Sequence, residues 1–211
     1  MKQVLKRHFI ATLLGACLAC PASAADDFTE LALAAARQAF PGQEFGAESI
    51  VQGPLNHDGL VDFAVLTDGP TTNDGDEGPL RVAVFLGKKG GGFQAPIISG
   101  DTFRHPRVDQ ELEMKRGSLF LIRAIEGAGT ETFQFSMRGG ALVLVGEEQS
   151  YVQTQGKTAG DEMYGTSINF LTHVVISWDV IGKTRKESRK TFPPAPLIKL
   201  QDFHYLHHPR P

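Results

Sequence analysis

The sequence predicts a mainly β fold of the α+β class, in which an N-terminal helix is followed by antiparallel sheets. Three observations lead to this prediction. An alanine-rich run precedes Pro41, short segments rich in β-branched and aromatic residues are separated by Gly, Asp and Pro, and residues 133–138 alternate strictly between apolar and polar. These patterns together predict one helix and many short strands.

The first 24 residues have the organisation of a secretory signal peptide. Three cations lie within residues 2–7, and the apolar run over residues 9–18 is too short to span a bilayer. Ala22-Ser23-Ala24 fits a signal-peptidase site. We therefore expect an exported protein, periplasmic or secreted, whose mature chain starts at Ala25.

An alternative processing route involves the first cysteine. Leu14-Gly15-Ala16-Cys17 resembles a bacterial lipobox, which would place a lipid anchor on Cys17 and make the protein an outer-membrane lipoprotein. Both cysteines, Cys17 and Cys20, lie in the leader, so the mature chain has no disulfide and no thiolate ligand. Removing the three leader cations shifts the net charge from −3 to about −6, which argues against nucleic acid as a partner. No other apolar run is long enough to form a transmembrane segment.

The mature chain begins with a predicted helix. Asp27 is placed as its cap with Glu30 reaching back, the alanine-rich run over 31–40 continues it, and Pro41-Gly42 ends it. The residues expected on its buried face are Phe28, Leu31, Ala35 and Ala39.

The next part of the chain has the period of strands. The expected strands are residues 49–52, 61–67, 81–86 and 93–99. The second and third are apolar on both faces, which is typical of central strands that are covered on each side. The glycine-rich residues 88–92 predict a hairpin tip, and Pro96 marks the last strand as an edge.

A second β set follows the boundary predicted at His105-Pro106. Its expected strands are residues 111–114, 119–125, 133–138, 141–145 and 197–203, and residues 168–181 are expected to form one long strand or a strand pair. The Gly139-Gly140 pair predicts a tight hairpin. Residues 184–190 are interpreted as a basic, solvated stretch, and the three histidines His204, His207 and His208 as part of a frayed tail. We therefore divide the chain into a signal peptide (1–24), a helix with a β unit (25–104), and a C-terminal antiparallel β module with a Pro-rich connector and tail (105–211).

The main candidate binding site is the loop that leads into the strand at 61–67. Asn56, Asp58 and Asp62 provide side-chain oxygens and Leu60 a carbonyl, a donor set that suits Ca²⁺. Gly59 permits the sharp bend. The alternative is an Asx turn in which these oxygens accept backbone N–H groups and no metal is bound.

This loop resembles the FG-GAP/VCBS repeat, whose pattern is Asp-x-Asn-x-Asp-Gly-x-x-Asp followed by an apolar strand. The match covers Asn56, Asp58, Gly59, Asp62 and residues 63–65, whereas Pro54 stands where the pattern has its first aspartate. The resemblance implies a calcium role for the loop. The order of helix, single FG-GAP-like unit and β-rich half also resembles small secreted bacterial proteins of this type. One unit cannot close a propeller, so we expect it to pack with the second β module as a sheet or sandwich.

The sequence favours binding over catalysis. It contains no Gly-x-Ser-x-Gly and no His-Glu-x-x-His, and the Gly-Lys-Thr triplets at 156–158 and 182–184 lack the earlier glycine of a phosphate loop. We expect an exported, non-enzymatic binding or scaffold protein whose partner is a protein or an envelope polymer. Two alternatives stay open: a periplasmic inhibitor or immunity-type protein that neutralises an envelope-acting toxin, and a carboxylate-dependent envelope hydrolase.

Overall fold

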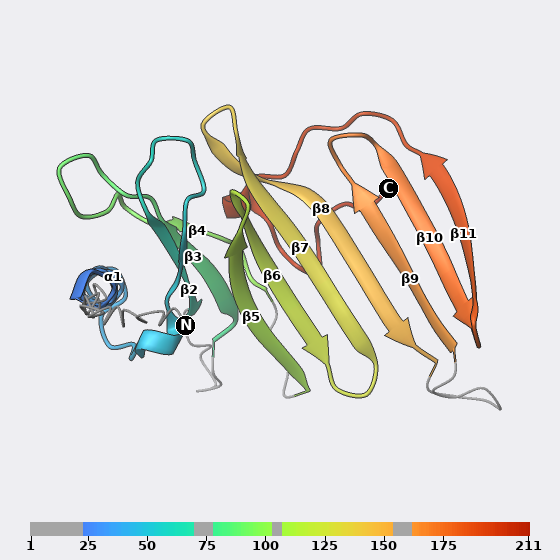
Figure 1. Cartoon of the computed structure of the whole chain (residues 1–211), viewed down its shortest axis with the longest axis horizontal. Coiled ribbons are helices and arrows are strands. Elements are labelled where there is room, and N and C mark those ends of the chain that lie inside the picture. The colour runs from blue at the N-terminus through green and yellow to red at the C-terminus, as the bar shows by residue number, and fades with distance from the viewer. Residues whose placement is uncertain (1–22, 70–77, 103–106, 154–161) are drawn as a thin grey trace, which may run out of the picture.

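The computed structural model describes residues 23–69, 78–102, 107–153 and 162–211. It confirms the predicted mainly β fold, with one α-helix and two antiparallel sheets (Figure 1). Most of the proposed signal peptide and the boundary at His105 lie outside the described residues.

The first sheet has four strands in the order β1-β2-β3-β4. The elements of this half are α1 (Ser23–Ala39), η1 (Ala47–Ser49), β1 (Val51–Gly53), β2 (Asp62–Asp68), β3 (Leu80–Phe85) and β4 (Ile97–Ile98). β2 and β3 are the central strands, as predicted, and β4 is the edge strand next to Pro96. The predicted hairpin tip is also present, because Lys88 N–H donates to the Gly92 carbonyl at 3.0 Å.

Helix α1 covers one face of the first sheet. Ala32 and Ala36 are fully buried, and their small side chains let the helix approach the phenyl rings of Phe63 and Phe85, which stack with centroids 4.4 Å apart. The expected buried face was wrong at Leu31, which is 59% exposed, because the contacting positions are one residue further along. The helix already includes Ser23, so Asp27 lies inside it and is not its cap.

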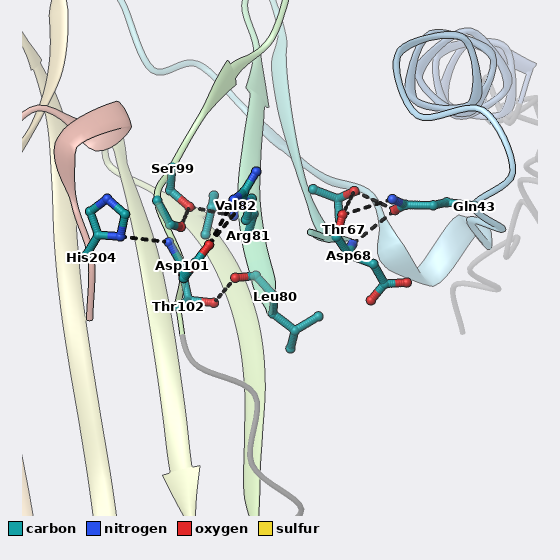
Figure 2. Close-up of polar contacts among 11 residues, drawn as sticks. Gln43, Thr67, Asp68, Leu80, Arg81, Val82, Ser99, Asp101, Thr102 and His204 are labelled. Atoms are coloured by element: carbon teal, nitrogen blue, oxygen red, sulfur yellow. Dashed lines mark hydrogen bonds and ion pairs between the residues drawn. The ribbon is translucent and has the colours of Figure 1, made fainter. Parts of the chain in front are cut away.

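Gln43, four residues after the end of the helix, links this part of the chain to β2. The side chain of Gln43 donates to the Asp68 carbonyl at 2.9 Å and accepts from Asp68 N–H at 3.0 Å, as a neighbouring strand would (Figure 2). These two bonds satisfy the backbone N–H and C=O groups at the end of β2, on the side where no neighbouring strand is present.

The second sheet has seven strands in sequence order, from β5 at one edge to β11 at the other (Figure 1). Its strands are β5 (Val108–Lys115), β6 (Ser118–Ile125), β7 (Gly129–Arg138), β8 (Ala141–Val152), β9 (Glu162–Asn169), β10 (Val174–Ile181) and β11 (Thr184–Thr191). The second face of the first sheet packs on it through a core that includes Ala64, Val84, Leu121 and Phe133. The predicted packing of two β modules is therefore present.

Two segments of the second half differ from the prediction. Residues 184–190 are solvated, as predicted, but they belong to a full-length strand, β11, because each of its eight residues pairs with β10. Residues 197–203 do not form a strand. They make a single bridge between Lys199 and Val143 and then the 3-10 turn η2 (Leu200–Asp202).

The segment after η2 joins the two sheets. Leu200 and Phe203 are fully buried in the shared core. Asp101 N–H, which follows the first sheet, donates to Nδ1 of His204 at 3.3 Å (Figure 2). Within the residues that the structure describes, no helix is both long and apolar enough to cross a membrane.

Candidate functional site

The predicted calcium loop is organised by Asp62. This carboxylate is fully buried; one oxygen accepts Leu55 N–H at 2.8 Å and the other accepts Gly87 N–H at 2.9 Å. The loop is thus closed on itself and linked to the end of β3. Gly59 has a φ of 77°, a value that favours glycine and agrees with its predicted place at the bend.

The other predicted ligands are used locally. The side-chain oxygen of Asn56 accepts Asp58 N–H at 3.2 Å, and a carboxylate oxygen of Asp58 accepts Leu60 N–H at 2.8 Å. These are the bonds of consecutive Asx turns. No group of three His, Cys, Asp or Glu side chains in the described ranges is arranged to hold a metal ion. Calcium binding by this loop stays a prediction. The structure shows that the side-chain oxygens of the loop accept backbone N–H groups.

The loop over residues 54–60 also forms the wall of a cleft. Figure 1 shows this loop at the same end of the molecule as the turns at 116–117, 138–140 and 170–173, an end that we call the turn end. A cleft of about 550 Å³ lies there, bounded by the loop and by these turns, the third of them through Leu171. We call it the turn-end cleft. Its size is within the range that small-molecule and oligomer sites occupy.

Two arginines and one histidine lie around the turn-end cleft. Arg116 and Arg138 come from two different hairpins of the second sheet, and His57 comes from the loop of the first. All three are exposed. Among the described residues that line the cleft, none is Asp or Glu. Because guanidinium groups stay protonated at any physiological pH, the cleft is positive in a chain whose formal net charge is −3.

The floor of the cleft is polar and ordered. The hydroxyl groups of Ser118 and Ser136 lie 2.6 Å apart across neighbouring strands, and the Gln134 amide donates to Ser118 at 3.0 Å. Both serines are buried. The apolar part of the lining consists of Leu55, Met137, Val145 and Leu171. The cleft therefore offers cations at its mouth, with hydrogen-bonding and apolar groups below.

The backbone at the turn end includes two unusual residues. Among the described non-glycine residues, only Arg116 (φ 52°) and His173 (φ 54°) adopt the left-handed conformation, and both lie in turns at this end. Glycine or asparagine is the usual choice in such a turn, since other side chains cost about 1 kcal/mol or more there. Strain of this kind clusters at functional sites, which makes the turn end a candidate functional region.

A second polar cluster is buried under the C-terminal segment. The Arg123 guanidinium pairs with Glu131, and both side chains are at most 3% exposed. Tyr151 donates a hydrogen bond to the same carboxylate, and the ring of Tyr205 lies 3.5 Å from the Arg123 guanidinium carbon. Burial, and then the hydrogen bond to Glu131, raise the pKa of Tyr151 and of Tyr205 above that of an ordinary tyrosine.

The C-terminal segment completes this cluster. Nε2 of His208 lies 3.0 Å from one oxygen of Glu147, and Nε of Arg210 lies 2.7 Å from the other. The prediction of a frayed tail was wrong for His208, which is buried and fixed. Every charge in the cluster has an opposite charge beside it, so the cluster is organised to hold the segment in place.

Sequence reasoning missed both the cleft and the buried cluster as assemblies. The Gly139-Gly140 pair predicted a hairpin, but its convergence with residues 54–60 depends on how the two sheets pack. Arg123 and Glu131 could have been recognised from the sequence. Each is a charged residue at a position where the alternation of its strand predicts a buried apolar one. No family model, curated protein or solved structure matches this chain, so the function must be argued from the chemistry of its own residues.

Proposed function

We propose that this chain is an exported, non-enzymatic binding protein of FG-GAP/VCBS-like organisation that holds an anionic segment of an envelope polymer in the turn-end cleft. The observation that carries the proposal is the charge of the lining: two arginines, one histidine and no carboxylate among the described lining residues, in an acidic chain. A carboxylate, sulfate or phosphate group satisfies guanidinium groups better than a neutral ligand does.

The floor of the cleft supports a sugar polymer as the ligand. Sugar rings present hydroxyl groups and an apolar C–H face, and the cleft has partners for each. Ser118, Ser136 and Gln134 can exchange hydrogen bonds with hydroxyl groups, while Leu55 and Met137 can pack against a ring. An acidic polysaccharide combines these features with the negative charge that Arg116 and Arg138 require.

The same lining argues for binding over hydrolysis. Glycoside hydrolysis uses a pair of carboxyl groups on either side of the bond that is cleaved. The buried carboxylates Glu131 and Glu147 instead lie beneath the C-terminal segment, each beside a cation. They hold the fold together and do not line the turn-end cleft.

Titration with an acidic oligosaccharide tests the proposal. Oligogalacturonate should bind the native chain saturably in calorimetry, with an affinity that falls as salt rises, and neutral malto-oligosaccharides should not bind. The Arg116→Asn/Arg138→Gln double variant should bind at least tenfold more weakly. Lys186→Gln on β11 is the matched control, because it removes one exposed cation far from the cleft. Native affinity in the double variant, or no binding of oligogalacturonate to the native chain, would contradict the proposal.

A further inference from the structure

Strand β11 forms an open edge of the second sheet. It pairs with β10 over all eight residues, from Ile181 with Thr184 to Val174 with Thr191, without a bulge. All eight of its residues are exposed, and none is proline. At the opposite edge, β5 lies against β1 and β2 of the first sheet. The outer side of β11 therefore presents extended backbone N–H and C=O groups to which another strand can bond.

The charge of β11 selects against a second copy of the same strand. The strand carries four cations and only one carboxylate, that of Glu187. The cations are Arg185, Lys186, Arg189 and Lys190. In the fully overlapped antiparallel pairing of two copies, Arg185 would face Lys190 and Lys186 would face Arg189. Like charges directly opposite each other are destabilising, whereas an acidic strand would meet a cation at these positions.

Exposed apolar side chains lie on the two strands behind this edge. Three of them, on β9 and β10, are Met163, Tyr164 and Ile181, each between 41% and 53% exposed. Ile181 pairs with Thr184 of β11, so it lies on the strand next to the edge strand. In the described part of the chain, neither of the two core clusters includes a residue of β10 or β11. Outside those clusters Val174 and Trp178 of β10 are buried, whereas the three side chains named above stay exposed.

We infer that β11 is a docking strand for an extended, acidic segment of another protein, which adds to the sheet as an eighth strand. Main-chain hydrogen bonds supply the pairing, as in other cases of strand addition. Specificity comes from the two faces of β11. Lys186 and Lys190 project on one face, Arg185 and Arg189 on the other, so the partner carries Asp or Glu on both faces of its strand. This site is separate from the turn-end cleft.

The experiment uses a synthetic eight-residue peptide, Val-Glu-Glu-Val-Val-Glu-Glu-Val, titrated into the isotopically labelled full chain. Its Glu residues lie on both faces of a strand and stand opposite the four cations of β11 in antiparallel pairing. The peptide should bind saturably, shift the backbone amide resonances of β11, and slow hydrogen exchange there. A peptide with N-methyl groups at alternate positions, which keeps the charge but blocks pairing along one edge, should bind at least tenfold more weakly. The Lys186→Glu/Arg189→Glu variant should lose binding to a similar extent, and Arg116→Asn, in the cleft, should retain it.

Three outcomes would overturn the inference. The first is equal affinity of the chain for the unmodified peptide and for N-methylated peptides that block pairing along one edge or the other. That result would show that charge alone holds the peptide, without main-chain pairing. The second is equal affinity for a Lys-Val peptide. The third is displacement of the peptide by phosphatidylglycerol vesicles with protection of β11, which would assign the strand to an anionic lipid surface.

Discussion

Nε2 of His208 lies 3.0 Å from a carboxylate oxygen of Glu147, although the two residues are 61 positions apart in the chain. Both side chains are at most 1% exposed. The other oxygen of Glu147 is bonded by Gln149 at 2.7 Å and by Arg210 at the same distance. A single buried carboxylate on β8 therefore fixes the end of the C-terminal segment.

Glu147→Gln should destabilise the protein by about 2 kcal/mol, because a buried acceptor loses its charge and its bonds to His208 and Arg210 weaken. Urea unfolding measures the change. The matched control is Glu148→Gln, the next residue, which is exposed on the opposite face of β8 and should change stability by less than about 0.5 kcal/mol. Equal losses of stability in the two variants would contradict the role of Glu147 in fixing the C-terminal segment.

Alkaline pH should destabilise the fold through Tyr151 and Tyr205. The pKa of both tyrosines is raised in the folded state, by burial first and by the hydrogen bond to Glu131 second. An unfolded chain loses these protons near pH 10, whereas the folded chain keeps them to higher pH. Stability is therefore fully present below about pH 10 and falls above it. The urea midpoint between pH 8 and 11.5 measures this, and Tyr151→Phe should make the fall less steep; an unchanged slope would count against this explanation.

Asp62→Asn should lower the free energy of unfolding by about 2–4 kcal/mol. The Asp62 carboxylate accepts two backbone N–H groups, and in the variant one of them would face an amide NH₂ group. Asp58→Asn, at an exposed position in the same loop, should cost far less. For the native chain we expect EDTA to shift the melting temperature little or not at all. A large fall on adding EDTA, abolished by Asp58→Ala, would show instead that bound Ca²⁺ stabilises the loop.

Gly165→Ala should destabilise the β9–β10 pair by about 1–3 kcal/mol. A β-carbon at this position would lie 2.4 Å from the indole ring of Trp178 and 2.2 Å from the Gln149 carbonyl oxygen. Since Trp178 is the only tryptophan, its fluorescence spectrum reports the displacement directly. Ser167→Ala, two residues further along the same face, is the control and should leave the spectrum unchanged.

The sequence predicted the first sheet more closely than the second. Residues 63–66 and 82–86 carry a continuous apolar signal, because both of their faces are buried, and they are the central strands β2 and β3. Strand β11 gave no such signal, because all of its side chains are exposed and only its pairing with β10 makes it a strand. Periodicity detects burial, and it cannot detect an edge strand that buries nothing.

The candidate site could likewise be predicted from the sequence only in part. The Asx pattern at Asn56, Asp58 and Asp62 is local, so its turn geometry could be predicted from the sequence alone. The turn-end cleft brings Arg116 and Arg138 together with His57, and their meeting depends on register and on the packing of two sheets. The same holds for Glu147 and His208, whose separation in the chain leaves no local pattern to read.

The dependence of both sheets on η2 and the residues just after it has a consequence for how the chain folds. Leu200 and Phe203 fill the space between sheets whose strands end at Thr191, and His204 reaches back 103 residues to Asp101. During synthesis the two sheets emerge well before the residues that close them, leaving Arg123, Glu131 and the neighbouring phenylalanines in contact with water. Productive folding must therefore wait until His208 has emerged, and the incomplete chain is the form most in need of a chaperone.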